Sequence, residues 1–188
     1  TSRDWIPISG DFNGDAYTDI GIYNNTNGEC KIALNDKNSK FTDKGLWVDF
    51  SDASYDWQVL TADFNNDGKT DLAVYNARTG ELRAALSDGA KFGSFETKLT
   101  NFSNSTDWQA MLADVNGDSL ADLALFKKSS GEWKVALYTG SLFVDTGVWI
   151  SNFAKDKQPL LADFNNDATT DIGYWDSGSI KYAISTGA

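Results

Sequence analysis

Residues 63–75 read DFNNDGKTDLAVY, an aspartate-rich loop that runs directly into an apolar segment. The same pattern, D-x-N-x-D-x-x-x-D, begins at four places, 52, 51 and 49 residues apart: Asp11, Asp63, Asp114 and Asp163. An internal repeat of this period is typical of propellers and solenoids, in which each unit packs against its neighbours. The chain of 188 residues is therefore predicted to consist of four copies of one unit.

The repeated loops have the ligand spacing of a calcium site. Side-chain oxygens occur at loop positions 1, 3, 5 and 9, and position 7 offers a backbone carbonyl, which is how a short loop wraps a hard cation. We expect one Ca²⁺ in each loop and four in the chain. The predicted ligands are Asp11, Asn13, Asp15, Tyr17 and Asp19; Asp63, Asn65, Asp67, Lys69 and Asp71; Asp114, Asn116, Asp118, Leu120 and Asp122; and Asp163, Asn165, Asp167, Thr169 and Asp171.

An EF-hand and an ordinary turn are the alternatives to this calcium loop. An EF-hand needs a bidentate Glu at position 12 and a helix after the loop. Position 12 is instead apolar or aromatic here, and each loop is followed by a β-rich segment, at residues 20–23, 72–75, 123–126 and 172–175. Turns need only one or two Asp or Asn residues, so four matching loops favour a metal site.

The remainder of each unit has the pattern of a four-stranded antiparallel sheet. A strand such as 57–62 or 108–113 precedes the loop, and a turn with a glycine follows the second strand. The third strand alternates apolar and polar residues, and an outer strand is expected to open at Phe41, Phe92 or Phe143. The metal loop thus lies between the first and second strands. The fourth unit is expected to lack its outer strand, because Ala188 falls where that strand would begin.

These features predict an all-β fold, a β-propeller with one blade per repeat in a single repeat domain over residues 1–188. The approximate blades are 1–52, 53–103, 104–153 and 154–188. Second strands that are apolar on both sides fit blades that stack face to face. Three arrangements stay open: a fragment of a larger propeller or secreted protein, half of an assembly completed by a second copy, or a four-bladed ring. An unfinished blade leaves an exposed edge, through which self-assembly is possible.

Composition narrows the function classes. The chain has 27 acidic and 16 basic residues and a formal charge of −11, so nucleic acid is not an expected partner. Four calcium ions would reduce this charge to about −3. The chain has no histidine and a single cysteine, which leaves little for catalysis, and we expect that it is not an enzyme. It has no long apolar segment, so membrane insertion is not expected, and its composition fits a secreted, extracellular or cell-surface protein.

The loops, as in residues 63–75, resemble the FG-GAP or VCBS repeats of calcium-bearing propellers, over essentially the whole chain. Similar blades occur in integrin α-subunits, in fungal and bacterial propeller lectins, and as appendages of secreted polysaccharide-degrading enzymes. Only Phe92-Gly93 preserves the Phe-Gly pair of the family name, so the repeats look closer to the VCBS branch. The resemblance implies a non-catalytic carbohydrate-binding or adhesion module. The alternative is a calcium-stabilised structural or protein-interaction scaffold attached to a secreted polysaccharide-active enzyme. The implied partner is a glycan or an extracellular protein.

Tryptophan residues are the candidate contacts for such a ligand, because planar rings are what sugars stack on. Trp5, Trp57 and Trp108 each precede a metal loop by the same interval, and we interpret them chiefly as fillers between blades. Trp47 and Trp149 occupy matching places near the end of the outer strand. We therefore expect Trp47 and Trp149 to contact the ligand.

Overall fold

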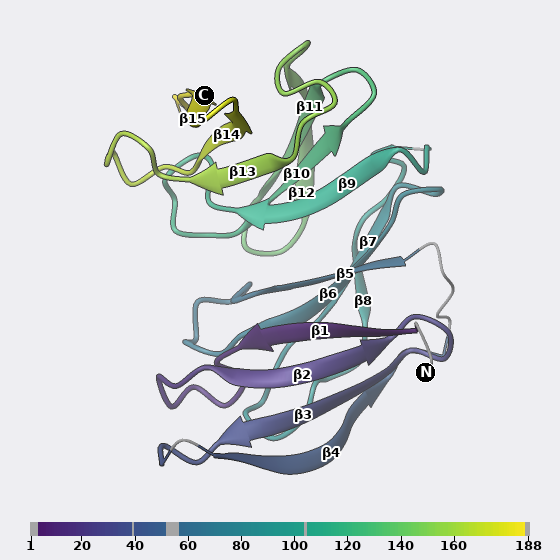
Figure 1. Ribbon diagram of the computed structural model, residues 1–188. Coiled ribbons are helices and arrows are strands. Elements are labelled where there is room, and N and C mark those ends of the chain that lie inside the picture. The colour runs from purple at the N-terminus through teal and green to yellow at the C-terminus, as the bar shows by residue number, and fades with distance from the viewer. Residues whose placement is uncertain (1–3, 39, 52–56, 104, 187–188) are drawn as a thin grey trace.

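The computed structural model describes residues 4–38, 40–51, 57–103 and 105–186, and every regular element in them is a β-strand. The strands form four antiparallel sheets, which follow one another along an arc as the blades of a propeller (Figure 1). Within the described residues, no helix has the length and apolar character needed to cross a membrane.

Each blade is a meander in which the strands pair in chain order. Blade 1 contains β1 (Trp5–Gly10), β2 (Asp19–Asn24), β3 (Glu29–Asn35) and β4 (Phe41–Asp49). Blade 2 contains β5 (Trp57–Ala62), β6 (Asp71–Asn76), β7 (Glu81–Ala85) and β8 (Glu96–Leu99). Blade 3 contains β9 (Trp108–Ala113), β10 (Asp122–Lys127), β11 (Glu132–Tyr138) and β12 (Phe143–Ile150). Blade 4 has three strands in the described residues, β13 (Pro159–Ala162), β14 (Asp171–Asp176) and β15 (Ser179–Ala183). The predicted all-β fold, with a three-stranded fourth blade, is confirmed.

The second strand of each interior blade is buried on both faces, as the apolar sequence predicts. All six residues of β6 are buried, and so are five of the six in β10. Leu72 and Val74 of β6 belong to the core shared with blade 1, whereas Ala73 and Tyr75 belong to the core shared with blade 3. The hydrophobic core therefore lies in layers between blades rather than within any one sheet.

The outer strand of blade 2 corrects the sequence analysis. Strands β4 and β12 begin at Phe41 and Phe143 as expected, but β8 begins at Glu96 and not at Phe92. Phe92 lies in a turn, where a single bridge pairs it with Ser87. Its ring is buried between the blades, 5.6 Å from the ring of Phe12. Packing against the neighbouring blade, rather than strand pairing, fixes this aromatic residue.

A glycine in the turn between the second and third strands contacts the linker to the next blade. The Phe102 N–H donates to the Gly80 carbonyl at 3.1 Å. A Cβ on Gly80 would lie 2.2 Å from the carbonyl oxygen of Ser103, and the φ angle of Gly80 is +67°. Gly178, the counterpart in blade 4, also has a positive φ, +94°, but its missing Cβ faces open space.

We expect Gly80→Ala to lower the free energy of unfolding by about 2 kcal/mol, because alanine is strained at positive φ and its Cβ must displace the linker. Gly178→Ala is the matched control, since it adds only the backbone strain. Urea unfolding of the two variants measures the difference. Equal losses in both variants would show that the contact with the linker contributes nothing.

Candidate metal centres and binding groove

The aspartate at loop position 1 organises each predicted metal loop through backbone hydrogen bonds. In the first loop, Asp11 Oδ1 accepts the N–H groups of Gly14 at 2.8 Å and Asp15 at 3.1 Å, and its Oδ2 accepts that of Ala16 at 2.6 Å. The same kind of bond recurs at Asp63, Asp114 and Asp163. A carboxylate in this role draws the loop into a tight curl.

Positions 3, 5 and 7 are joined in the same way in every loop. In the third loop, Asn116 Nδ2 donates to Asp118 Oδ2 at 3.0 Å, and Asp118 Oδ1 accepts the Leu120 N–H at 2.8 Å. Equivalent bonds occur in the other three loops. Hydrogen bonds thus link loop positions 3, 5 and 7 within one short turn.

The aspartate at position 9 is buried and ties the loop to its blade. Asp71 accepts the Phe64 N–H at 3.0 Å and the Ser87 N–H at 2.7 Å, and its side chain is fully buried. Burial, with a smaller contribution from the neighbouring loop aspartates, raises the pKa of Asp71 to about 6. Asp122 shows the same burial and the same raised pKa of about 6. A cation beside Asp71 or Asp122 would offset the repulsion between that carboxylate and the other aspartates of its loop.

The donor set fits a hard cation, although the carboxylates are not gathered as ligands. In the described residues, no three Asp, Glu, His or Cys side chains are grouped to hold one metal ion. The side-chain donors are all oxygens, which calcium prefers. Lysine ammonium groups already stand beside two of the position 5 carboxylates: Lys69 Nζ lies 2.8 Å from Asp67 Oδ2, and Lys37 Nζ lies 3.4 Å from Asp15 Oδ2. These carboxylates therefore attract positive charge in the folded loop.

Trp47 does not lie where the sequence analysis expected it. Only 3% of its surface is exposed, and its ring packs on Phe92 at 5.3 Å and on Phe12 at 6.3 Å. The expectation that Trp47 contacts a ligand is therefore corrected. Its place near the end of β4 turns the indole into the layer between blades 1 and 2, where it fills space.

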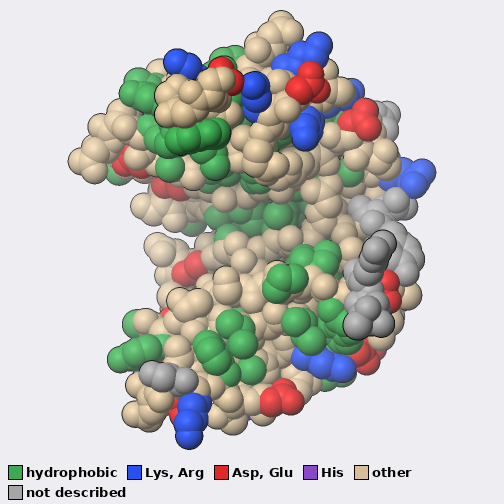
Figure 2. All heavy atoms as spheres, in the orientation of Figure 1, with side chains coloured by type: hydrophobic (Ala, Val, Ile, Leu, Met, Phe, Trp, Pro, Cys, Tyr) green, Lys and Arg blue, Asp and Glu red, His purple; other side chains and the backbone are tan. Residues whose placement is uncertain are grey.

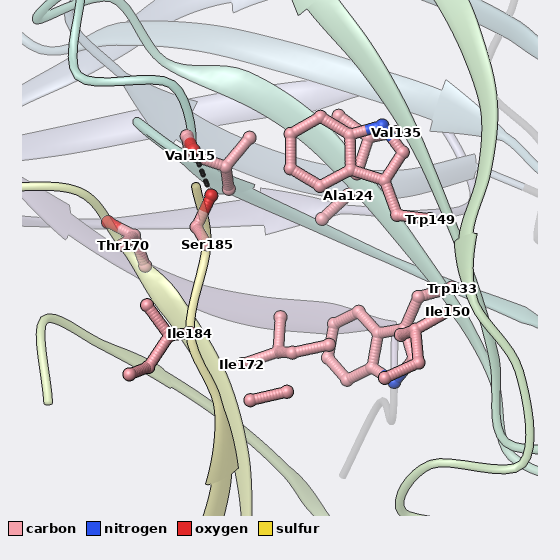
Figure 3. A pocket seen from close by; sticks show the side chains of 11 residues that line it. Val115, Ala124, Trp133, Val135, Trp149, Ile150, Thr170, Ile172, Ile184 and Ser185 are labelled. Carbon is pink, nitrogen blue, oxygen red and sulfur yellow. Dashed lines mark hydrogen bonds between the residues drawn. The ribbon is translucent and has the colours of Figure 1, made fainter. Parts of the chain in front are cut away.

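Trp149, the counterpart of Trp47, lines a small apolar cavity of about 110 Å³ between blades 3 and 4. Trp133 and Trp149 of blade 3 and Ile172 and Ile184 of blade 4 point toward this space (Figure 3). Ser185 Oγ donates to the Val115 carbonyl at its edge. A cavity with so few polar groups suits an apolar side chain better than a sugar, whose hydroxyl groups need hydrogen-bond partners.

A second, more polar groove lies between blades 2 and 3, at the end of the blades opposite the metal loops. Its volume is about 370 Å³. The residues that line it come from the β6–β7 turn, the linker between the blades, and blade 3: Thr79, Asn101, Phe102, Ser103, Ser105, Trp108, Lys127 and Lys134. Gln58 of blade 2 positions Trp108, because its Nε2 donates to the Trp108 carbonyl at 2.7 Å.

Two lysines bring positive charge to this groove. The Nζ of Lys127 lies 5.6 Å from the ring centre of Trp108. The Nζ of Lys134 lies 4.5 Å from the ring centre of Phe102 and donates to the Phe102 carbonyl at 2.8 Å. Lys134 is therefore held by the linker, while Lys127 stands beside the indole at the groove. Sequence reasoning missed this site, because the β6–β7 turn of blade 2 and the lysines of blade 3 line one groove only when the blades pack.

The loops and the blades have counterparts in known proteins. Residues 11–74 match the model of the FG-GAP-like repeat. This FG-GAP-like match runs from the first metal loop through the second to β6. No protein among the curated sequences matches the chain.

Two solved structures have the same fold. One is a lectin of Agrocybe aegerita that recognises non-reducing terminal N-acetylglucosamine, with a TM-score of 0.78 and 20% identity over 98% of this chain and 50% of the lectin chain. The other is the Tc holotoxin pore of Photorhabdus luminescens, with a TM-score of 0.64 and 16% identity over 100% of this chain and 9% of that chain. This chain therefore spans about half the length of the lectin, and identities this low establish a shared fold only.

Proposed function

We propose that this chain is a non-catalytic, calcium-stabilised carbohydrate-binding module of a secreted or cell-surface protein, and that it holds a sugar in the groove between blades 2 and 3. The observation that carries the proposal is the composition of that groove. Asn101, Ser103, Ser105 and Lys127 line it, and the apolar wall beside them includes Trp108, of whose surface 6% is exposed. A few polar groups beside an apolar wall are the usual means of orienting a small polar ligand.

The size of the groove supports a sugar. About 370 Å³ lies within the range of small-molecule sites, which runs from roughly 300 to 1,000 Å³. The structural similarity to a lectin supports the same class of ligand. Metal loops at the opposite end of the blades would stabilise the site without touching the sugar.

The single cysteine, Cys30, does not support the alternative of a cysteine-dependent enzyme. Cys30 is fully buried, and burial raises the pKa of its thiol to about 12. The thiol is therefore protonated at neutral pH and enclosed between blades 1 and 2, where a substrate has no access to it.

Lys127→Ala is expected to weaken binding of an N-acetylglucosamine-terminated oligosaccharide about ten-fold, because one charge-assisted hydrogen bond contributes roughly 1.5 kcal/mol. Lys128→Ala is the matched control, since Lys128 is the exposed neighbour and does not line the groove. Isothermal titration calorimetry measures both affinities. A third variant, Ser105→Trp, fills the groove and should abolish binding.

The proposed site would be wrong if the oligosaccharide bound equally well to Lys127→Ala, Lys128→Ala and Ser105→Trp. Failure of the wild-type chain to bind any glycan on an array would reject carbohydrate binding as a whole. The scaffold function would then be the better account. The exposed apolar faces at the two ends of the arc favour that second candidate.

A further inference from the structure

Blade 4 exposes a face that is buried in every other blade. Trp175 of β14 is 58% exposed, whereas its counterparts Tyr23, Tyr75 and Phe126 are fully buried against the following blade. Ile180 and Tyr182 of β15 are also exposed, by 43% and 49%. We call the surface formed by Phe164, Trp175, Ile180 and Tyr182 the forward face of blade 4.

Blade 1 exposes the opposite kind of face. Ile20 and Ile22 of β2 are 44% and 40% exposed. The equivalent residues of β6, Leu72 and Val74, are fully buried against the preceding blade. Phe41 is likewise 47% exposed. We call the surface formed by Thr18, Ile20, Ile22 and Phe41 the backward face of blade 1. Figure 2 shows hydrophobic side chains gathered over β2 and β3 and again around β15.

Contacts between consecutive blades show which groups these two faces lack. Phe12, at position 2 of the first metal loop, meets Phe92 of blade 2 at 5.6 Å. Phe64, at position 2 of the second loop, meets Phe143 of blade 3 at 6.2 Å. The same position in blade 4 is Phe164, which is only partly buried. The residue of blade 1 equivalent to Phe92 and Phe143 is the exposed Phe41.

Hydrogen bonds join the metal loops of blades 1 and 2 and those of blades 3 and 4. The Thr70 N–H donates to the Asp11 carbonyl at 2.6 Å, and Thr70 Oγ1 accepts the Asp11 N–H at 3.0 Å. Between blades 3 and 4, the Thr170 N–H donates to the Asp114 carbonyl at 2.7 Å. Loop position 8 of blade 1 is also a threonine, Thr18, and it is exposed.

We propose that the forward face of blade 4 docks on the backward face of blade 1 of a second copy of this chain. The contact continues the interface that already joins consecutive blades, and the missing groups match: Phe41 meets Phe164, Thr18 bonds to Asp163, and Ile22 covers Trp175. Such a head-to-tail contact uses two different surfaces, so it either closes into a ring or extends by adding chains.

Analytical ultracentrifugation at micromolar and sub-millimolar concentrations tests this proposal. The wild-type chain should sediment with a mass above the 20.6 kDa of one chain, increasingly so at higher concentration. Ile22→Lys removes the backward face and Trp175→Asp removes the forward face, so each variant alone should stay monomeric. Leu142→Lys is the control, because Leu142 is 54% exposed and lies outside both faces.

Mixing the two single variants gives the sharpest result. Each variant keeps the face that the other lacks, so the mixture should form a dimer of one chain of each kind and grow no further. Equal melting temperatures would show that the exposed substitutions leave the fold intact. The proposal is wrong if the wild type stays monomeric throughout, if either single variant still associates, or if the mixture does not pair. A monomeric wild type would show that the two faces do not bind each other.

Discussion

Removal of calcium is expected to lower the stability of the folded chain more than any single substitution does. At free calcium about ten-fold above the dissociation constant, mass action contributes about 1.4 kcal/mol per loop and about 6 kcal/mol for four loops. For a domain of this size, that loss lowers the melting temperature by about 15 °C. Differential scanning calorimetry in calcium and in chelator measures the change directly. The physical reason is that an ion bound by the folded loop and not by the unfolded chain stabilises the folded state.

A substitution at loop position 5 distinguishes the stability contributed by the bound ion from the stability contributed by the loop's own hydrogen bonds. Asp118→Ala should lose about 1.4 kcal/mol of stability in calcium and much less in chelator, because Asp118 is exposed and caps only its own loop. Asp49→Ala, at an exposed aspartate outside the loops, is the charge-matched control. Equal losses for Asp118→Ala with and without calcium would sink the ion-mediated account.

Removal of the aspartate at loop position 9 should lower stability whether or not calcium is bound. Asp71→Ala is therefore expected to have the second large effect on the free energy of unfolding. The carboxylate of Asp71 accepts two backbone N–H groups, from Phe64 and Ser87, and is fully buried. Its removal leaves both donors without an acceptor, at about 1 to 3 kcal/mol each. We expect a loss of about 4 kcal/mol in chelator as well as in calcium. Urea unfolding under both conditions measures it.

The contrast between Asp71→Ala and Asp118→Ala is itself informative. Both remove one aspartate of a predicted metal loop, but only Asp71 also anchors the loop to the end of β7. If Asp71→Ala lost stability only in calcium, the carboxylate would serve the ion alone, and its two backbone hydrogen bonds would contribute nothing measurable.

Local sequence predicts much of this fold because the repeat is carried by local chemistry. The strands at 57–62 and 108–113 begin and end where the alternation and the first loop aspartate place them. Alternating burial in β3 and β7 follows the same rule. The hydrogen bonds that the side chains at loop positions 1, 3 and 5 make within the loop join residues at most five positions apart, so each copy of the pattern can form this turn by itself.

The errors concern residues whose place depends on another blade. Trp47 and Trp149 occupy equivalent positions, yet Trp47 is buried by Phe92 of the next blade while Trp149 borders a cavity. Phe92 does not begin a strand, because its ring packs in the layer between blades 1 and 2. Lys127 and Lys134 of blade 3 share the groove with Thr79 of blade 2, which lies there only because the two blades pack together. None of these neighbours is close in sequence, so no local pattern indicates them.

The measurement that tests the central claim most directly is native mass spectrometry of the chain in calcium, which counts bound ions per chain. Four equivalent loops predict four Ca²⁺ ions on the wild type, three on Asp118→Ala, and none after chelation. A chain that carries no calcium at all, with an unchanged melting temperature in chelator, would contradict the account. The four loops would then be Asp and Asn turns held by their own hydrogen bonds.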